Sequence, residues 1–188
     1  MIKRKMLILT LMIAQLGFSQ NSTSELNNES LSDLSNTPVV SGFYNRINVG
    51  VLGGSNSSPS FNIINGYRFN EHWSSGLGLG TELFLGRMYV PFFLEGNYNF
   101  LKKSTTPWLS IMSGYELPID NLGDAKGGFT CGGKVGFSYF VGKHVGISTS
   151  LGYRFAYLRD ESNWWGWEDF ITISEINRFE FRVGMVFK

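Results

Sequence analysis

Residues 179–187 read FEFRVGMVF, and their side chains alternate in character along the chain. The odd positions are all large and apolar: Phe179, Phe181, Val183, Met185 and Phe187. The even positions begin with Glu180, Arg182 and Gly184. Such a period of two is typical of a β-strand whose two faces meet different surroundings. A soluble barrel packs its apolar face inward, whereas a membrane barrel turns that face toward lipid.

The same alternation recurs and predicts eight strands, at about 43–53, 59–69, 73–84, 88–100, 108–117, 128–141, 145–158 and 175–187. Helical spacing fits these runs poorly. The connections after the second, fourth and sixth strands are short. Those after the fifth and seventh, 118–127 and 159–174, are longer. Short turns at one end and longer loops at the other are expected of an outer-membrane barrel.

The charged residues of these strands fall almost entirely in one phase. They are Arg46, Arg68, Glu82, Glu95, Glu116, Lys134, Arg154, Arg178, Glu180 and Arg182. The other phase carries too many large apolar side chains for the narrow interior of eight strands. The sequence therefore predicts an all-β fold, an eight-stranded antiparallel up-and-down transmembrane β-barrel. A lipocalin-like soluble barrel would require the reverse orientation.

Charges in a lumen should form a paired network, because unpaired buried charges are costly. The candidate partners of Glu95 are Arg68, Lys134 and Arg154. Such a network would plug the lumen and argues against a wide pore.

Aromatic residues gather near the predicted strand ends, as two interfacial girdles would require. Those assigned to the turn end are Tyr67, Phe69, Trp73, Tyr98, Phe100, Tyr139 and Phe187. Those assigned to the loop end are Phe61, Tyr89, Tyr115, Phe129, Tyr157 and Phe179. Trp108, Phe93 and Phe140 fall in the inward phase and are expected to fill the barrel near its lower rim.

The first residues, MIKRKMLILTLMIAQLGFSQ, predict a secretory signal peptide over 1–19. Their apolar run is too short for a membrane anchor helix. Residues 20–42 are polar and predict a disordered periplasmic lead-in, and residues 43–188 form the barrel. Removing three bases leaves 13 Lys and Arg against 15 Asp and Glu. This balance makes nucleic acid an unexpected partner. The single cysteine, Cys131, allows no intrachain disulfide.

These eight runs, the segment 139-YFVGKHVGISTSLGYRF-155 and the last strand together resemble a known family. The chain is similar, over about 43–187, to small outer-membrane β-barrel proteins of the OmpA/OmpX type, often labelled porin family. The resemblance implies a Gram-negative outer membrane, with its lipid and lipopolysaccharide as surroundings. It also implies recognition of the aromatic terminal strand by the barrel-assembly machinery. Here Phe187 is penultimate, which departs slightly from that signal.

Catalytic chemistry finds little support. The two histidines, His72 and His144, fall in predicted turns on different hairpins, and no His/Cys set has metal-ligand spacing. GLGLG at 76–80 alternates as a strand and opens no helix. We therefore expect no enzyme and no cofactor.

The segment 159–174 is the candidate contact loop for an unidentified extracellular ligand. Its contact residues would be Trp164, Trp165 and Trp167, and the alternative is that these are girdle tryptophans at the rim. The function class that the sequence favours is a structural or interaction protein. The alternative is a narrow channel for small solutes, and an outer-membrane enzyme has the least support.

Overall fold

The computed structural model describes residues 41–54, 57–84, 87–119, 124–141, 144–163 and 169–188. Over these ranges the chain forms eight strands: β1 (Gly42–Gly53), β2 (Ser58–Arg68), β3 (Trp73–Phe84), β4 (Arg87–Asn99), β5 (Thr105–Pro118), β6 (Asp124–Phe140), β7 (Val145–Asn163) and β8 (Asp169–Phe187). The predicted signal peptide and almost all of the lead-in lie outside the described residues.

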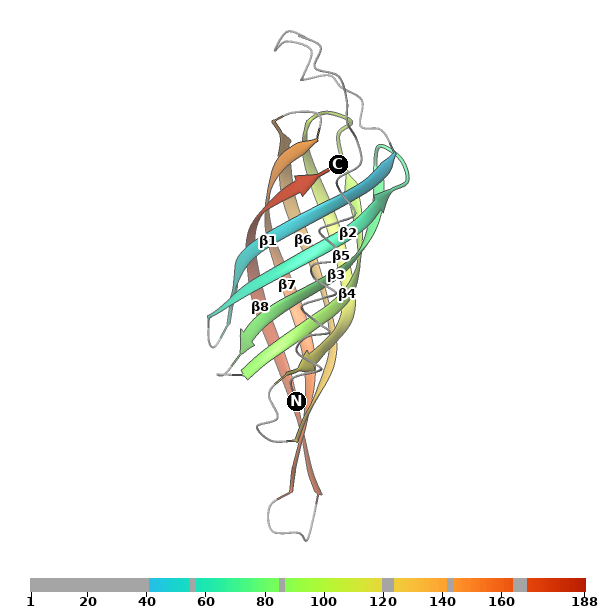
Figure 1. The fold of residues 1–188 in the computed structure, drawn as a ribbon. Coiled ribbons are helices and arrows are strands. Elements are labelled where there is room, and N and C mark those ends of the chain that lie inside the picture. The colour runs from blue at the N-terminus through green and yellow to red at the C-terminus, as the bar shows by residue number, and fades with distance from the viewer. Residues whose placement is uncertain (1–40, 55–56, 85–86, 120–123, 142–143, 164–168) are drawn as a thin grey trace.

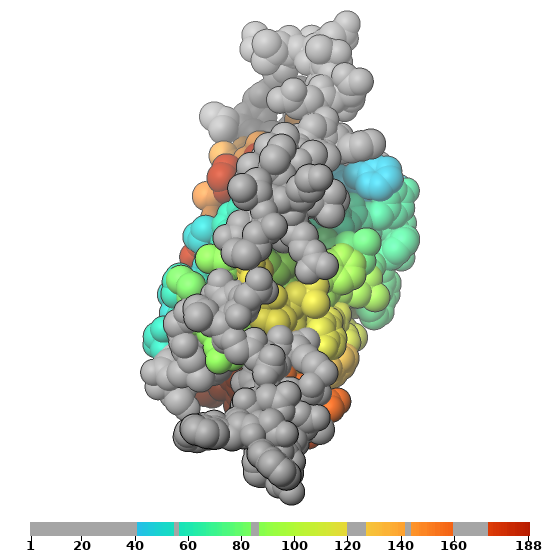
Figure 2. Space-filling model, turned by 60° about the horizontal axis from the view of Figure 1, so that its bottom comes forward, coloured from blue at the N-terminus to red at the C-terminus, as the bar shows by residue number. Residues whose placement is uncertain are grey.

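Each strand pairs antiparallel with the next, and β1 pairs with β8 to close the barrel (Figure 1). The fold class predicted from the sequence is therefore confirmed. The closing ladder runs from Asn45 opposite Phe187 to Gly53 opposite Phe179. In the space-filling view the colours of successive strands follow one another across one face, green through yellow (Figure 2). Within the described part, no helix is long and apolar enough to cross a membrane.

The turn end of the barrel holds the connections after β2, β4 and β6, and the loop end holds the others. At the first of these turns the Asn70 side-chain oxygen accepts hydrogen bonds from the backbone N–H of His72 (2.9 Å) and Trp73 (2.8 Å). This arrangement closes the turn with a local side-chain contact, as asparagine commonly does.

The two connections predicted as long loops, 118–127 and 159–174, are shorter than expected, because strand covers 124–127, 159–163 and 169–174; their predicted bounds were wrong. β7 continues to Asn163 and pairs there with Asp169, the first residue of β8. β6 already begins at Asp124, with a register shift between Ala125 and Gly127. Outside a bilayer a strand needs no apolar face. Its alternating pattern can therefore disappear while the backbone ladder continues.

The β7–β8 hairpin consequently extends beyond the strand β1, with which the rest of β8 pairs. β8 pairs with β1 only from Phe179 onward, so residues 169–178 pair with β7 alone in the described ladders. Figure 1 shows this hairpin projecting at the lower end of the molecule.

The outer face carries the apolar phase. Leu77, Leu94, Val135 and Leu151 are all more than half exposed, and Leu151 reaches 60%. Among the predicted girdle residues, Tyr67, Phe69, Trp73, Tyr115, Phe129 and Phe179 are exposed as well. Tyr89 was wrongly assigned to the girdle: it is 3% exposed and shares the inward phase with Phe93 and Glu95. Its place near a strand end suggested the interface, but the strand's own alternation turns it inward.

Glycine makes room for the aromatic side chains inside. A Cβ on Gly78 would lie 2.2 Å from the Phe93 ring, and a Cβ on Gly136 would lie 2.2 Å from the Trp108 ring. Real Cβ atoms cannot approach so closely, so each large ring occupies the space left by glycine on a paired strand. Gly78 belongs to the GLGLG run, whose glycines thus serve packing.

Candidate functional site

The candidate site is the lumen, which contains two ion clusters. The turn-half cluster centres on Glu95 of β4, which is fully buried. Arg46 of β1 and Lys134 of β6 reach it from opposite sides and each forms a hydrogen-bonded ion pair with its carboxylate. Arg46 also donates to Asn97 (3.4 Å), whose amide donates to the Tyr44 hydroxyl (3.3 Å). One carboxylate therefore serves two buried cations.

The loop-half cluster holds the remaining lumen acids and three arginines. It consists of Glu82, Glu116, Arg154, Arg178, Glu180 and Arg182. Arg154 lies 2.5 Å from Glu82 and 3.7 Å from Glu180.

In the same cluster, Arg178 lies 3.3 Å from Glu116, and Arg182 lies 2.6 Å from Glu180. The Lys134 ammonium is 3.9 Å from Glu180, which joins the two clusters. All six side chains are buried, so the charges compensate one another rather than facing bulk water.

An apolar plug fills the turn half of the same lumen. Its members are Tyr44, Ile64, Phe93, Met112, Phe140 and Val186. In the turn half, the two cations that pair with Glu95 also lie over aromatic rings. The Arg46 guanidinium carbon lies 5.0 Å from the Trp108 ring centroid, and the Lys134 ammonium lies 5.9 Å from that of Phe93. These are cation–π distances, so the rings support the cations while they occupy the cross-section.

Arg68 stands apart from both clusters. It ends β2 at the turn end, opposite Gly42 and Ser74, and is 8% exposed. Lys188, which follows β8, places its ammonium 3.5 Å from the Phe140 ring centroid. Burial, and then the nearby positive charge of Arg68, lower the pKa of Lys188 from 10.5 to about 8.

The structure brings nine of the ten predicted lumen charges into the two clusters and leaves Arg68 at the mouth. The predicted partners of Glu95 were Arg68, Lys134 and Arg154. Lys134 is one, and Arg46 is a second that was missed. The inward phases of β1, β2, β5 and β8 could have revealed Tyr44, Ile64, Met112 and Val186 as plug residues. Trp164, Trp165 and Trp167 lie outside the described residues.

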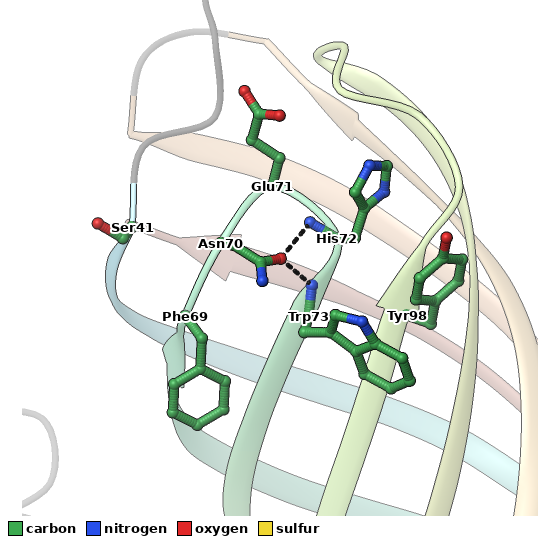
Figure 3. A pocket seen from close by; sticks show the side chains of 7 residues that line it. All are labelled: Ser41, Phe69, Asn70, Glu71, His72, Trp73 and Tyr98. Atoms are coloured by element: carbon green, nitrogen blue, oxygen red, sulfur yellow. Dashed lines mark hydrogen bonds between the residues drawn. The ribbon is translucent and has the colours of Figure 1, made fainter.

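A shallow pocket of about 560 Å³ lies at the turn end, beside the β2–β3 turn (Figure 3). Its lining residues are Ser41, Phe69, Asn70, Glu71, His72, Trp73 and Tyr98. The His72 ring stacks on Tyr98 (centroids 5.5 Å apart), and its Nδ1 lies 2.7 Å from the Asn99 carbonyl oxygen. Glu71 forms an ion pair with Lys102. The pocket groups are thus engaged in holding two turns together.

Among the described residues, no group of three or more His, Cys, Asp or Glu side chains could hold a metal ion. Cys131 is a half-buried free thiol in the outward phase of β6. Its neighbours on that phase are Phe129 on one side and Gly133, then Val135, on the other.

No protein-family model and no curated protein matches the sequence. Among solved structures, the fold resembles Neisserial surface protein A, with a TM-score of 0.61, 16% identity, and coverage of 78% of this chain and 96% of that one. OprG, an outer membrane protein from Pseudomonas aeruginosa, gives a TM-score of 0.60 at 11% identity, over 78% and 95% of the two chains. The outer membrane protein AlkL gives 0.57 at 15% identity, over 89% and 96%. The chain thus has the fold of small outer-membrane β-barrels.

Proposed function

We propose that this chain is an outer-membrane protein of a Gram-negative bacterium whose barrel is a sealed anchor. In this role the barrel holds the chain in the bilayer, conducts no solute and catalyses no reaction. The β7–β8 hairpin then projects from the loop end and supplies a surface for interaction. Strand number and a polar lumen favour the OmpA/OmpX type among small barrels.

The observation that carries the proposal is the filled turn half of the lumen. Glu95 binds Arg46 and Lys134 across the interior, and the rings of Phe93 and Trp108 pack against these cations. A solute would have to break buried ion pairs and displace two aromatic side chains to pass. Leaving a buried charge without its partner is costly, so separating these pairs to admit a solute is unfavourable.

The apolar outer face of the barrel supports its placement in a membrane. Apolar side chains cover the outer face, while the inner face holds every predicted lumen charge. In water this arrangement would expose a large continuous apolar surface, whereas in lipid it satisfies both faces. The likeness in fold to three outer-membrane barrels supports the same placement.

Conductance in a planar bilayer tests the sealed barrel against the alternative of a narrow channel. We expect the native protein to give no discrete current steps. The variant Phe93→Ala/Trp108→Ala, which removes the two rings that pack against Lys134 and Arg46, serves as the comparison and should give measurable steps. Heat-modifiable gel mobility verifies that both proteins are folded. Discrete currents through the native protein would reject the sealed anchor and support the small-solute channel.

A further inference from the structure

Outward-facing aromatic rings flank the pocket at the turn end of the barrel. Phe69, just after β2, and Trp73, at the start of β3, are 60% and 55% exposed. The Phe69 ring lies 5.6 Å from that of Tyr67, and the Trp73 ring lies 4.9 Å from that of Tyr98 on β4. Exposed aromatic rings at the strand ends of a membrane barrel lie at the bilayer interface. The pocket therefore opens toward lipid headgroups.

The polar groups of this pocket lie nearer the tip of the turn than its apolar walls do. In Figure 3 the rings of Phe69 and Trp73 point away from the tip, and Asn70 lies between these two residues. Glu71 points the opposite way. The Asn70 oxygen accepts from the backbone N–H groups of His72 and Trp73, which leaves its NH₂ group as a donor. From the barrel wall to the tip, the pocket thus presents two apolar walls, a hydrogen-bond donor and a carboxylate.

The tip of the turn carries one negative and one positive charge. Glu71 Oε2 pairs with the Lys102 ammonium of the β4–β5 turn, and Oε1 remains for a second cation. The two side chains are 36% and 60% exposed, so their pair contributes little stability and opens readily. His72 is already engaged, because its Nδ1 donates to the Asn99 carbonyl oxygen at 2.7 Å. A molecule with one positive and one negative group can therefore pair with both charges at the tip.

We infer that this pocket binds the headgroup of a phosphatidylethanolamine-type phospholipid of the surrounding leaflet. The primary ammonium of the lipid donates to Glu71. Its phosphate accepts from the Asn70 NH₂ group and is balanced by the Lys102 ammonium. The acyl chains follow the rings of Phe69 and Trp73 along the barrel wall.

The chemistry of the headgroup decides among phospholipids. The pocket places apolar walls, a donor and a carboxylate in the same order in which this lipid carries its chains, phosphate and ammonium. A choline headgroup has no N–H to donate to a carboxylate, and a glycerol headgroup has no cation. The inference rests on the membrane placement within the proposed function, but it does not depend on the sealed lumen.

Native mass spectrometry of the folded protein, released from micelles with equal amounts of phosphatidylethanolamine, phosphatidylcholine and phosphatidylglycerol, measures the retention of each lipid. We expect several-fold greater retention of phosphatidylethanolamine than of either other lipid. Glu71→Gln should remove this preference, because the amide has no charge for the ammonium. Asn70→Asp should weaken retention, since aspartate keeps the acceptor oxygen that closes the turn and replaces the donor with a negative charge. The matched control, Glu175→Gln, removes an exposed acid from β8 at the loop end and should keep the native preference.

Nuclear Overhauser contacts in nanodiscs that contain phosphatidylethanolamine locate the bound headgroup. The ethanolamine methylene protons should contact the Asn70 NH₂ protons in the native protein, and Glu71→Gln should lose these contacts. Equal retention of the three lipids, a preference for the choline or glycerol headgroup, or an unchanged preference in Glu71→Gln overturns the inference and leaves the sealed anchor standing. A folded barrel that does not insert into nanodiscs rejects the membrane placement of the proposed function and, with it, this lipid site.

Discussion

Replacing Glu95 by Gln should be among the most damaging single changes in the barrel. The substitution keeps the side-chain size and removes the one negative charge shared by Arg46 and Lys134. Both cations would remain buried, at 6% and 5% exposure. Removing one member of a buried ion pair typically costs about 3–5 kcal/mol. We therefore expect Glu95→Gln to lower the free energy of unfolding by about that amount.

Urea-induced unfolding from lipid vesicles, followed by tryptophan fluorescence, measures this loss at an unchanged denaturant slope. Glu71→Gln is the matched control, because its pair with Lys102 is exposed and should contribute only about 0.2–1 kcal/mol. Adding Lys134→Met to Glu95→Gln should recover part of the loss, since one of the stranded cations is then absent. Arg68→Gln, at the mouth, should be additive with Glu95→Gln. A Glu95→Gln effect as small as that of Glu71→Gln, or strict additivity with Lys134→Met, would refute the coupled network.

Three further outcomes are expected. Leu151→Arg, on the outer face, should cost about 2–4 kcal/mol in the vesicle unfolding assay, while Leu101→Arg, in the turn after β4, should cost little; equal costs would mean that the two positions do not differ in depth. Replacing Trp164, Trp165 and Trp167 together with Ser should preserve heat-modifiable mobility and abolish binding to any surface partner found by pull-down, and failure to assemble would identify them as girdle anchors. N-terminal sequencing of the membrane-bound protein should begin at Gln20 if residues 1–19 are a signal peptide, and an intact Met1 would contradict this.

Most of the fold could be predicted because period-two alternation carries so much information in a lipid-facing strand. In β8, Phe181 faces out and Arg182 faces in, as the pattern requires. A shift of one residue would exchange the two environments, so the phase is strongly constrained. The same logic assigned Leu94 outward and Glu95 inward on β4.

The parts that sequence reasoning missed have a common cause. Residues 159–163, RDESN, contain no apolar side chain, so this part of β7 has no period-two pattern and was interpreted as a loop. Their backbone ladder nevertheless continues to Asn163 opposite Asp169. Pairings inside the lumen were equally hidden, because the contact between Arg46 and Glu95 spans strands β1 and β4, which are not neighbours in the sheet. Only the curvature of the closed barrel brings these two side chains together.

The sequence predicted that Phe93 and Phe140 of the apolar plug fill the barrel, but it left the smaller member Ile64 unidentified. Ile64 follows Ser58, Ser60 and Asn62 on the inward phase of β2, and a single apolar residue among small polar ones is a weak signal. Its role becomes visible from Gly76 on β3, because a Cβ there would lie 2.8 Å from the Ile64 methyl group.

The central claim is that the apolar phase faces lipid and the charged phase faces a filled lumen. Nuclear Overhauser contacts between acyl-chain protons and labelled methyl groups test it without any substitution. The methyl groups of Leu94, Val135 and Leu151 should show such contacts, and those of Leu52, Ile64 and Val186 should show none. Acyl-chain contacts at the second set and none at the first would contradict the orientation of the barrel wall and the account built on it.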